Sequence, residues 1–226
     1  MKKDKFIFVP ILFLLLTSFS SGQQTISSSS TTQNSNTFIE IKSKTEYPAS
    51  FEFSTSGYKY IINDSRRGKR TGGNSSARTF NLRLSKDEIL ERVIFYAQYQ
   101  KDVLLIGESY VNDGSGGFIT RLDGQTLKMK WKRSIPAFNV GQGLLDKNYA
   151  YVTGIGFVGK VNLNSGIYVW RHDNLYGEND SAFNSFELPE LKGNTVLFRE
   201  SENYLRQKVA TLKIYTRSGR IIKINR

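Results

Sequence analysis

Few residues of this chain have the types and spacing that catalysis requires. His172 is the single histidine, in the segment "WRHDN", and Asp173 follows it directly. A Ser-His-Asp mechanism needs a histidine base that a carboxylate orients. Adjacent residues on a strand point to opposite faces, and the sequence contains no nucleophile-elbow motif. We therefore expect His172 to be a polar residue at the end of a strand.

Metal and carboxylate chemistry has equally little support. The segment "NDGSGG", Asn112 to Gly117, resembles a calcium loop only in part, because it lacks alternating oxygen ligands and the closing glutamate. No P-loop, dinucleotide fingerprint or zinc spacing occurs, so no metal site is expected. A carboxylate pair for glycoside hydrolysis depends on a separation that sequence does not give, so a carbohydrate-active hydrolase stays an alternative. The candidate carboxylates are Glu88, Glu91, Glu108, Glu178 and Asp180.

Basic residues are the most prominent feature that could bind a partner. The formal net charge is +12, which favours acidic partners such as an anionic polysaccharide, lipid headgroups or nucleic acid. One basic cluster lies in residues 64–78, which we expect to be a surface loop. In the other, Lys128, Lys130 and Lys132 alternate along one face of a predicted strand, and Trp131 lies on the opposite face. A solvated strand face is the simpler interpretation, and an anion-binding face is the alternative. The candidate binding residues are Arg66, Arg67, Lys69, Arg70, Lys128, Lys130, Lys132 and Arg133.

From Phe38 onward, almost the whole sequence has the pattern of β-strands. β-Branched and aromatic runs are separated by turn signals, such as Asp123-Gly124 and Ser218-Gly219, at spacings of roughly 8 to 12 residues. The stretch Ser85 to Val93 is ambiguous between helix and strand, because a capping serine and acidic residues precede a strand-like run. The pattern predicts an all-β sandwich, barrel or propeller.

A repeated phrase narrows this choice. "GFITRLDGQTLKMKW" (117–131) and "GFVGKVNLNSGIYVW" (156–170) align without gaps, so the only two tryptophans occupy the same place. A third, degenerate copy near the end of the chain has Lys223 where the tryptophan would stand. A repeat of roughly 40 residues made only of strands predicts propeller blades, with a large aromatic side chain in the seam between neighbours. The residues that define the repeat are Phe118, Asp123, Trp131, Phe157, Asn162, Gly166, Trp170 and Gly219.

The phrase resembles the PQQ-type propeller repeat, the blade of quinoprotein dehydrogenases and of their non-enzymatic envelope relatives. The second copy places Asn162 at the usual aspartate position and Ser165-Gly166 at the usual Thr-Gly, whereas the first has Leu127 in place of the glycine. The resemblance covers Val103 to Asn174 well and Phe186 to Arg226 weakly. It implies a β-propeller-like stack of antiparallel blades, either about four blades or an open partial propeller, and says little about function.

The departures from this family restrict what the resemblance implies. Quinoprotein dehydrogenases are much longer and hold their quinone against adjacent cysteines and with a calcium ion, whereas this chain has no cysteine. Pyrroloquinoline quinone is therefore not expected, and we expect no other cofactor. The resemblance then implies a short, exported propeller that binds partners through loops and strand edges. An open sheet edge also predicts self-association.

The N-terminus predicts export. Residues 1–22 combine Lys2, Lys3 and Lys5 with an apolar run and small residues at a cleavage site, which is typical of a cleaved signal peptide. The apolar run is shorter than the roughly 20 residues of a membrane-spanning helix, so no span is expected after cleavage. Residues 23–37 are expected to be a disordered linker, because they are rich in Ser, Thr, Gln and Asn. Residues 38–226 form one predicted propeller-like domain, with the clearest blades at 93–135 and 138–174 and a weaker one at 183–226.

These observations favour a non-catalytic binding module. The expected setting is the bacterial periplasm or secretion, because an exported chain without cysteine takes its stability from a packed core. The favoured hypothesis is a propeller that binds a protein or an envelope component. The alternatives are a binder of an anionic polymer, through the basic loop 66–70 and the strand 128–133, and a carbohydrate-active enzyme.

Overall fold

The computed structural model describes residues 36–42, 50–63, 67–73, 77–82, 87–111, 114–175, 185–201 and 211–225. The predicted signal peptide lies outside the described residues, as does the predicted linker apart from its last two residues. The described part of the chain is built from strands, and it contains no helix of the length and apolarity needed to cross a membrane. The all-β prediction is confirmed.

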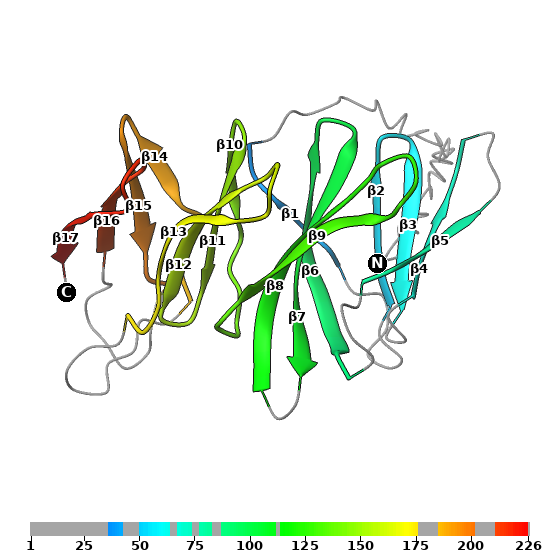
Figure 1. Cartoon of the computed structure of the whole chain (residues 1–226), viewed down its shortest axis with the longest axis horizontal. Helices are drawn as coiled ribbons and strands as arrows, with labels where there is room; N and C mark the ends of the chain where they lie inside the picture. Colours follow the sequence, from blue (N-terminus) through cyan, green and yellow to red (C-terminus); the bar gives the residue numbers. More distant parts are fainter. Residues whose placement is uncertain are drawn as a thin grey trace, which may run out of the picture. The chain divides into compact units, whose positions relative to one another are not determined.

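Four antiparallel sheets follow one another along the chain (Figure 1). Sheet I contains β2 (Ser50–Thr55), β3 (Tyr58–Asn63), β4 (Arg67–Thr71) and β5 (Arg78–Asn81). Sheet II contains β1 (Ile39–Glu40), β6 (Ile89–Tyr99), β7 (Asp102–Val111), β8 (Gly114–Leu122) and β9 (Met129–Ile135). Sheet III contains β10 (Leu144–Asp146), β11 (Tyr149–Gly154), β12 (Phe157–Asn162) and β13 (Tyr168–His172). Sheet IV contains β14 (Glu190–Lys192), β15 (Thr195–Arg199), β16 (Thr211–Tyr215) and β17 (Ile221–Asn225).

Each sheet has the topology of a propeller blade. Within a sheet the strands pair in sequence order, so that the first and fourth strands of the meander lie at opposite sides, and β1 adds to the first strand of sheet II. Four-stranded meanders that stack face to face are the units of β-propellers. The prediction of a β-propeller-like stack of antiparallel blades is therefore confirmed, and the described residues form four of them.

The hydrophobic core lies in the seams between successive sheets. In β7, Leu105 packs toward sheet I, whereas its neighbour Ile106 packs toward sheet III, and both are fully buried. Both faces of this strand are covered, which explains its continuous apolar run "VLLI" where a half-exposed strand would alternate. The seam between sheets III and IV is built in the same way, with Tyr151, Val158 and Phe198 in one cluster. A sheet in this array depends on its neighbours for burial.

The segment before sheet I joins sheets II and III. The N–H of Leu145 donates to the carbonyl of Asn36 at 2.6 Å, and the N–H of Phe38 donates to the carbonyl of Gly143 at 3.1 Å. Immediately afterwards β1 pairs with β6, and the Phe38 side chain is fully buried between the two sheets. The ordered contacts thus include Asn36 and Thr37, at the end of the segment expected to be a linker.

Two local predictions are wrong. The segment expected to be a basic surface loop, 64–78, contains β4 and the start of β5. Its polar composition concealed a strand because Gly68 leaves room for the Phe80 ring and because the long side chain of Arg70 is buried on internal acceptors. The helical alternative for residues 85–93 also fails where the structure describes them, since β6 begins at Ile89.

The repeated phrase forms the third and fourth strands of successive sheets and the turn between them. The carboxylate of Asp123 accepts the N–H groups of Gln125 and Thr126 at 3.0 and 2.7 Å, and the amide oxygen of Asn162 accepts two N–H groups of its own turn. These loops close through a left-handed residue, Leu127 (φ 61°) or Gly166 (φ 70°). The first hairpin turns at Asp123-Gly124, as expected, and Leu127 supplies its left-handed residue.

The glycine of each turn receives the tryptophan of the preceding sheet. A Cβ atom on Gly166 would lie 2.6 Å from the Trp131 ring, and one on Gly219 would lie 2.6 Å from Trp170. In sheet I the position of the tryptophan is occupied by Arg78. Arg78 lies opposite Arg70 on the neighbouring strand, just as Trp131 lies opposite Arg121 in sheet II. Here the following turn carries Leu127, buried in the seam with sheet I. The missing tryptophan in sheet I is thus matched by the missing glycine in the turn of sheet II.

We predict that Gly166→Ala destabilises the chain more than Gly57→Ala. Both glycines have strongly positive φ, 70° and 75°, so each alanine costs about 1–2 kcal/mol of backbone strain. Gly57 has open space around its Cβ position, whereas Gly166 faces Trp131, which adds about 1–3 kcal/mol of overpacking. Urea denaturation of the two variants measures the difference, and equal losses of stability would contradict the tryptophan contact.

Candidate functional site

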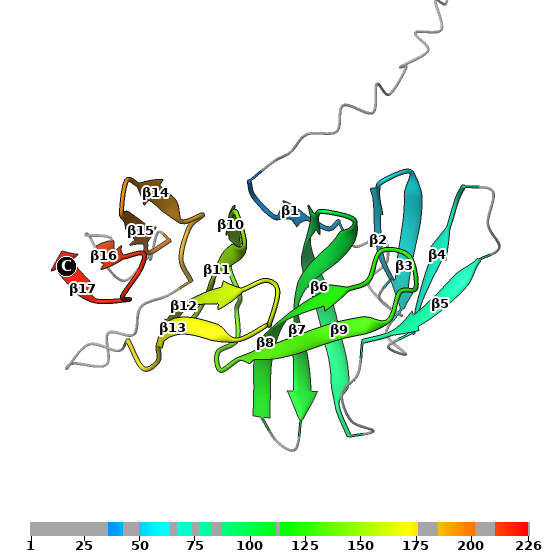
Figure 2. The same ribbon diagram turned by 45° about the horizontal axis from the view of Figure 1, so that its top comes forward.

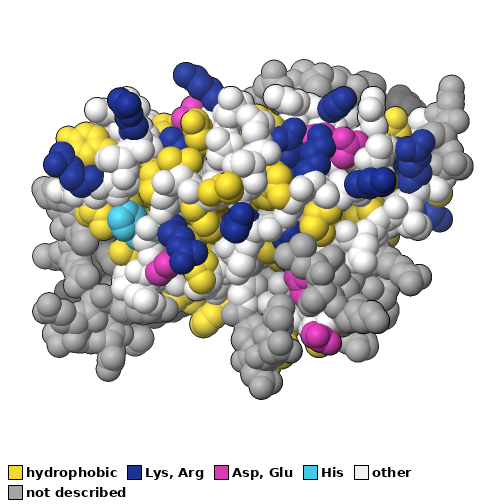
Figure 3. Space-filling view, in the orientation of Figure 1, with side chains coloured by type: hydrophobic (Ala, Val, Ile, Leu, Met, Phe, Trp, Pro, Cys, Tyr) yellow, Lys and Arg dark blue, Asp and Glu magenta, His cyan; other side chains and the backbone are white. Residues whose placement is uncertain are grey.

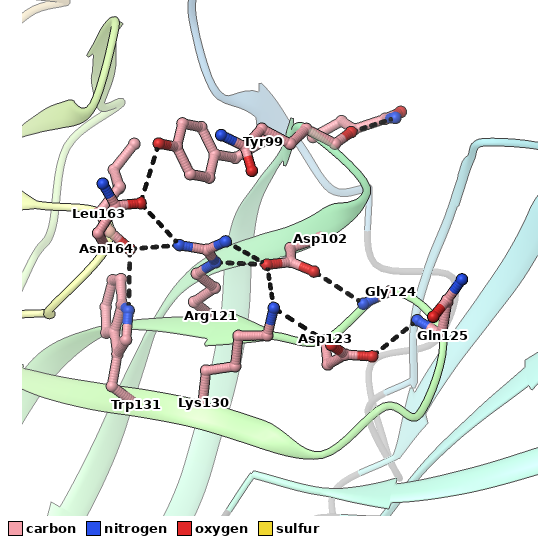
Figure 4. Close-up of polar contacts among 12 residues, drawn as sticks. Tyr99, Asp102, Arg121, Asp123, Gly124, Gln125, Lys130, Trp131, Leu163 and Asn164 are labelled. Atoms are coloured by element: carbon pink, nitrogen blue, oxygen red, sulfur yellow. Dashed lines mark hydrogen bonds and ion pairs between the residues drawn. The ribbon is translucent and has the colours of Figure 1, made fainter.

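A cluster of charged side chains around a buried carboxylate lies at the seam between sheets II and III (Figure 4). Asp102, at the start of β7, is 1% exposed. Its Oδ2 atom lies 2.5 Å from the guanidinium of Arg121 on β8 and 2.8 Å from Lys130 Nζ on β9, and its Oδ1 atom accepts the N–H of Gly124 at 3.1 Å. One carboxylate thereby holds three elements of its own sheet.

The electrostatics of this cluster are those of a permanent ion network. Burial by itself raises the pKa of Asp102, but the hydrogen bonds from Lys130, Gly124 and Arg121 together outweigh it and hold the pKa below its ordinary value. The hydrogen bond to Asp102 raises the pKa of Lys130, and the N–H of Thr126 with Lys130 lowers the pKa of Asp123. None of these groups is tuned to exchange a proton near neutral pH.

Arg121 also connects its sheet to the next one. Its Nη1 atom donates to the carbonyl of Leu163 at 2.8 Å, and Trp131 Nε1 donates to the same carbonyl at 3.0 Å (Figure 4). One sheet further, Lys160 Nζ and Trp170 Nε1 both donate to the carbonyl of Thr216, at 2.9 and 3.0 Å. The same pair of donors, a cation on the third strand and a tryptophan on the fourth, thus binds the turn of the following sheet.

The first seam follows this rule with the tryptophan missing. Arg70, on the third strand of sheet I, donates to the carbonyl of Gly124, and Arg78 donates to the carbonyl of Gln125 at 2.8 Å. The cations of all three seams lie over tyrosine rings, with Arg70 4.2 Å from the centroid of Tyr58. The other two pairs are Arg121 with Tyr99 at 4.8 Å and Lys160 with Tyr149 at 4.0 Å. Cations seated on aromatic faces away from water make these contacts strong.

Lys132 serves the opposite face of the same strand. It forms an ion pair with Glu88, donates to the carbonyl of Leu82 at 2.9 Å, and lies 4.0 Å from the centroid of the Phe118 ring. Burial lowers the pKa of Lys132 although Glu88 acts in the other direction. The expectation of a solvated lysine face on this strand fails for Lys132, which is buried against Glu88, whereas Lys128 and Lys130 are exposed.

The structure uses half of the predicted anion-binding residues internally. Arg70, Lys130 and Lys132 have the contacts given above, and Arg133 Nε donates to the carbonyl of Gly166 at 2.6 Å. Lys69 and Lys128 are exposed. Arg66 and the side chain of Arg67 lie outside the described residues.

The predicted catalytic candidates are likewise engaged. His172 Nε2 lies 2.6 Å from the carbonyl of Gly219, so that nitrogen carries the proton, and Asp173 pairs with Arg171 at 3.1 Å rather than with the histidine. Glu108 pairs with Arg92 at 2.6 Å and accepts the N–H of Val140 at 3.0 Å. Among the described ranges no group of three acidic or histidine side chains is placed to hold a metal ion. Asn112, Asp113, Glu178 and Asp180 lie outside them.

Exposed side chains at matching positions mark the fourth strands of sheets II to IV. A β-bulge recurs between the third and fourth strands, at Arg121/Leu122, Lys160/Val161 and Lys213/Ile214. It turns the residue opposite it outward: Val169 is 45% exposed and Ile222 is 41% exposed. Ile167, two residues before Val169, is 58% exposed. We call the following set the outer-strand surface: Lys128, Lys130, Ile167, Val169, Arg171, Arg220 and Ile222.

The outer-strand surface combines basic and aliphatic side chains. Figure 2 shows β9 and β13 on the same side of their sheets. On the face drawn in Figure 3, basic side chains are interspersed with hydrophobic ones, and acidic side chains are few. Sequence reasoning did not identify this surface, because a run of four apolar or aromatic residues, Ile167 to Trp170, does not show which of its side chains are exposed.

Comparisons with known proteins give a partial likeness of fold. The sequence matches no protein-family model and no curated protein. BamB from Moraxella catarrhalis has a TM-score of 0.48 and 15% identity, over 74% of this chain and 49% of that one. The quinohemoprotein alcohol dehydrogenase ADHIIG from Pseudomonas putida HK5 has a TM-score of 0.46 and 11% identity, over 77% and 34%. A europium-containing methanol dehydrogenase has a TM-score of 0.46 and 10% identity, over 81% and 43%. The chain spans less than half the length of each, and likeness of this extent does not identify an activity.

We predict that Asp102 makes the stability of the chain dependent on acid. Its pKa in the folded state is lowered from the unfolded value of about 3.9, so its contribution is present above that value and is lost as the pH falls through the folded pKa. Asp102→Asn leaves Arg121 buried without its carboxylate and costs about 3–5 kcal/mol at neutral pH.

Urea denaturation at neutral pH and at about pH 3 measures this effect. The exposed Asp87 gives the matched control, since Asp87→Asn removes the same charge without a buried partner. A parallel loss of stability on acidification in the wild type and in Asp102→Asn would show that other carboxylates determine the acid sensitivity.

Proposed function

We propose that this chain is an exported, non-catalytic interaction module whose outer-strand surface binds a protein partner. The observation that supports this proposal is a division of roles among its side chains. Three of the ionisable groups that the sequence offers for chemistry, His172, Glu88 and Glu108, have partners within the fold, whereas exposed aliphatic and basic side chains gather on the fourth strands. Rigid blades present such a surface in fixed register.

The engagement of the candidate catalytic groups argues against an enzyme. His172 is bound to a carbonyl, and Glu88 and Glu108 are each in an ion pair with a base. A carboxylate that is already paired with a cation of the fold is poorly placed to exchange a proton with a substrate. The quinone chemistry of longer propellers is not supported either, since the chain has no cysteine to lie against the quinone.

A protein partner fits the surface better than an anionic polymer. A polyanion is bound by repeated cations, and much of its affinity comes from counterion release. The outer-strand surface instead places Ile167, Val169 and Ile222 among its basic residues. Exposed aliphatic groups next to charges are typical of protein interfaces, where the charges steer the encounter and the apolar contacts hold the complex.

Export is supported by the N-terminal sequence alone. The basic start, short apolar run and small residues of 1–22 have the pattern of a cleaved signal. We therefore infer that the partner is an envelope or secreted protein.

Capture from envelope extract tests this function. The chain from Gln23 onward is immobilised as wild type, as Lys128→Glu and as Lys69→Glu, and bound proteins are compared at low and high salt. Both lysines are exposed, but Lys69 lies on β4 outside the outer-strand surface. We expect Lys128→Glu to weaken capture of a specific protein severalfold and Lys69→Glu to leave it unchanged.

The salt dependence separates the two partner classes. A protein that stays bound at high salt supports the proposal, because apolar contacts persist when charges are screened. If only polyanions bind at low salt and all are released at high salt, the anionic polymer is the partner. If the two charge reversals have equal effects, the outer-strand surface is not the binding site.

A further inference from the structure

The fourth strand of sheet III, β13, is an open sheet edge. It pairs with β12 on one side, in the register Lys160↔Trp170 and Val158↔His172. It is the last strand in the order of its sheet, and in the described part of the chain no strand pairs with its other side. An open edge presents a row of N–H and C=O groups to which another extended chain can add.

The corresponding edge of sheet II is protected. Tyr168 from sheet III donates its hydroxyl to the carbonyl of Ser134, near the end of β9, at 2.9 Å. The exposed Lys130 adds charge to the same strand, and lysine on an edge strand is a common protection against pairing. In sheet IV the residue equivalent to Tyr168 is Ile221, which has no hydroxyl to donate to β13. The protection of β9 is therefore not repeated on β13.

The side chains of β13 are those of a strand that pairs. The run Ile167 to Trp170 is apolar or aromatic, and its two outward aliphatic residues are exposed, Ile167 to 58% and Val169 to 45%. β-Branched residues on a free edge favour the addition of a strand, and their side chains supply the contacts that select it.

The charge around this edge selects an acidic occupant. Arg171 lies on β13 itself, where its exposed side chain pairs with Asp173 at 3.1 Å, and Arg133 reaches the turn before β13, where it binds the carbonyl of Gly166. Arg220 is exposed on the following sheet. A second copy of the chain is a poor occupant, because the formal net charge of +12 repels a like-charged molecule and edge-to-edge pairing brings Arg171 near its own copy.

We propose that β13 binds an extended segment of the partner protein, in which apolar and acidic residues alternate, as an added fifth strand of sheet III. This inference rests on the proposed function and specifies its chemistry. Backbone hydrogen bonds to the outer side of β13 hold the segment, its apolar residues cover Ile167 and Val169, and its carboxylates meet Arg171 and its neighbours.

A pair of synthetic peptides tests the strand addition. One is a short, end-blocked peptide in which valine and glutamate alternate, labelled for fluorescence anisotropy. The other has the same sequence with N-methyl groups on alternate residues, which keeps the charge and removes the N–H donors of one edge. We expect the methylated peptide to bind the chain about tenfold more weakly or worse, because several backbone hydrogen bonds are lost.

Two matched variants place the site. Val169 and Ile222 stand opposite the same bulge in successive sheets and are almost equally exposed. Val169→Lys adds an edge lysine to β13, and we expect it to weaken binding of the unmethylated peptide about tenfold, although its added positive charge attracts an acidic peptide. Ile222→Lys adds the same charge to β17, and the peptide should bind at least as tightly as to the wild type.

Each outcome has a defined meaning. Failure of the wild type to bind the unmethylated peptide, or equal binding of both peptides, overturns strand addition. Equal effects of Val169→Lys and Ile222→Lys overturn the assignment to β13. The proposed binding role of the outer-strand surface is tested separately, by capture from envelope extract. If Lys128→Glu impairs capture, that role is supported even when strand addition is overturned. If Lys128→Glu leaves capture unchanged, that role is contradicted whatever the peptides show. Thermal melting of each variant confirms that it is folded.

Discussion

The contact on which the rest of the structure depends is the seam between one sheet and the turn of the next. A four-stranded meander buries one face on the preceding sheet and the other on the following one, so its stability belongs to the array and not to the blade. At two seams a third-strand cation and a fourth-strand tryptophan converge on one carbonyl, at Leu163 or Thr216. A carbonyl at a turn has a lone pair that is free to accept a hydrogen bond. When donors of the neighbouring sheet supply these hydrogen bonds, they fix both the distance between the two sheets and their alignment.

The bulge that makes this convergence geometrically feasible also creates the outer-strand surface. A bulge places two residues opposite one and increases the local twist of the strand. In sheet III it allows Trp170 to face sheet IV while Tyr168 packs toward sheet II, and it leaves Val169 between them facing outward. The exposed aliphatic residues of the fourth strands are therefore a consequence of the seam geometry and recur at the same place in successive sheets. The proposed binding surface is thus a by-product of the way in which the sheets pack.

Sequence reasoning reached the fold because the repeat encodes the seam. The spacing of Trp131 and Trp170 in matching phrases predicted blades, and the structure has antiparallel sheets at those places. It did not reach the site, for two physical reasons. The alternation of Lys130 and Lys132 predicted a shared face, but the β-bulge opposite Lys130 breaks the alternation. Lys130 reaches Asp102, whereas Lys132 meets Glu88 from a distant segment. Strand β4 escaped notice because its burial uses Gly68 and the stem of Arg70 in place of apolar residues. Leu127 could be interpreted only once Arg78 was seen at the tryptophan position of the preceding sheet.

The outward faces of the two end sheets explain why binding is assigned to an edge. On sheet I this face carries the ion pair of Lys59 with Glu52 at 2.9 Å, and on sheet IV it carries Glu190 with Lys192 at 3.1 Å. Seam faces, in contrast, are lined by fully buried aliphatic and aromatic side chains such as Phe198. Covering a charged face with a further blade would cost the hydration of its ions without an equal gain of apolar contact. Adding a strand to β13 costs no such desolvation, since it pairs backbone groups and covers aliphatic side chains that already face water.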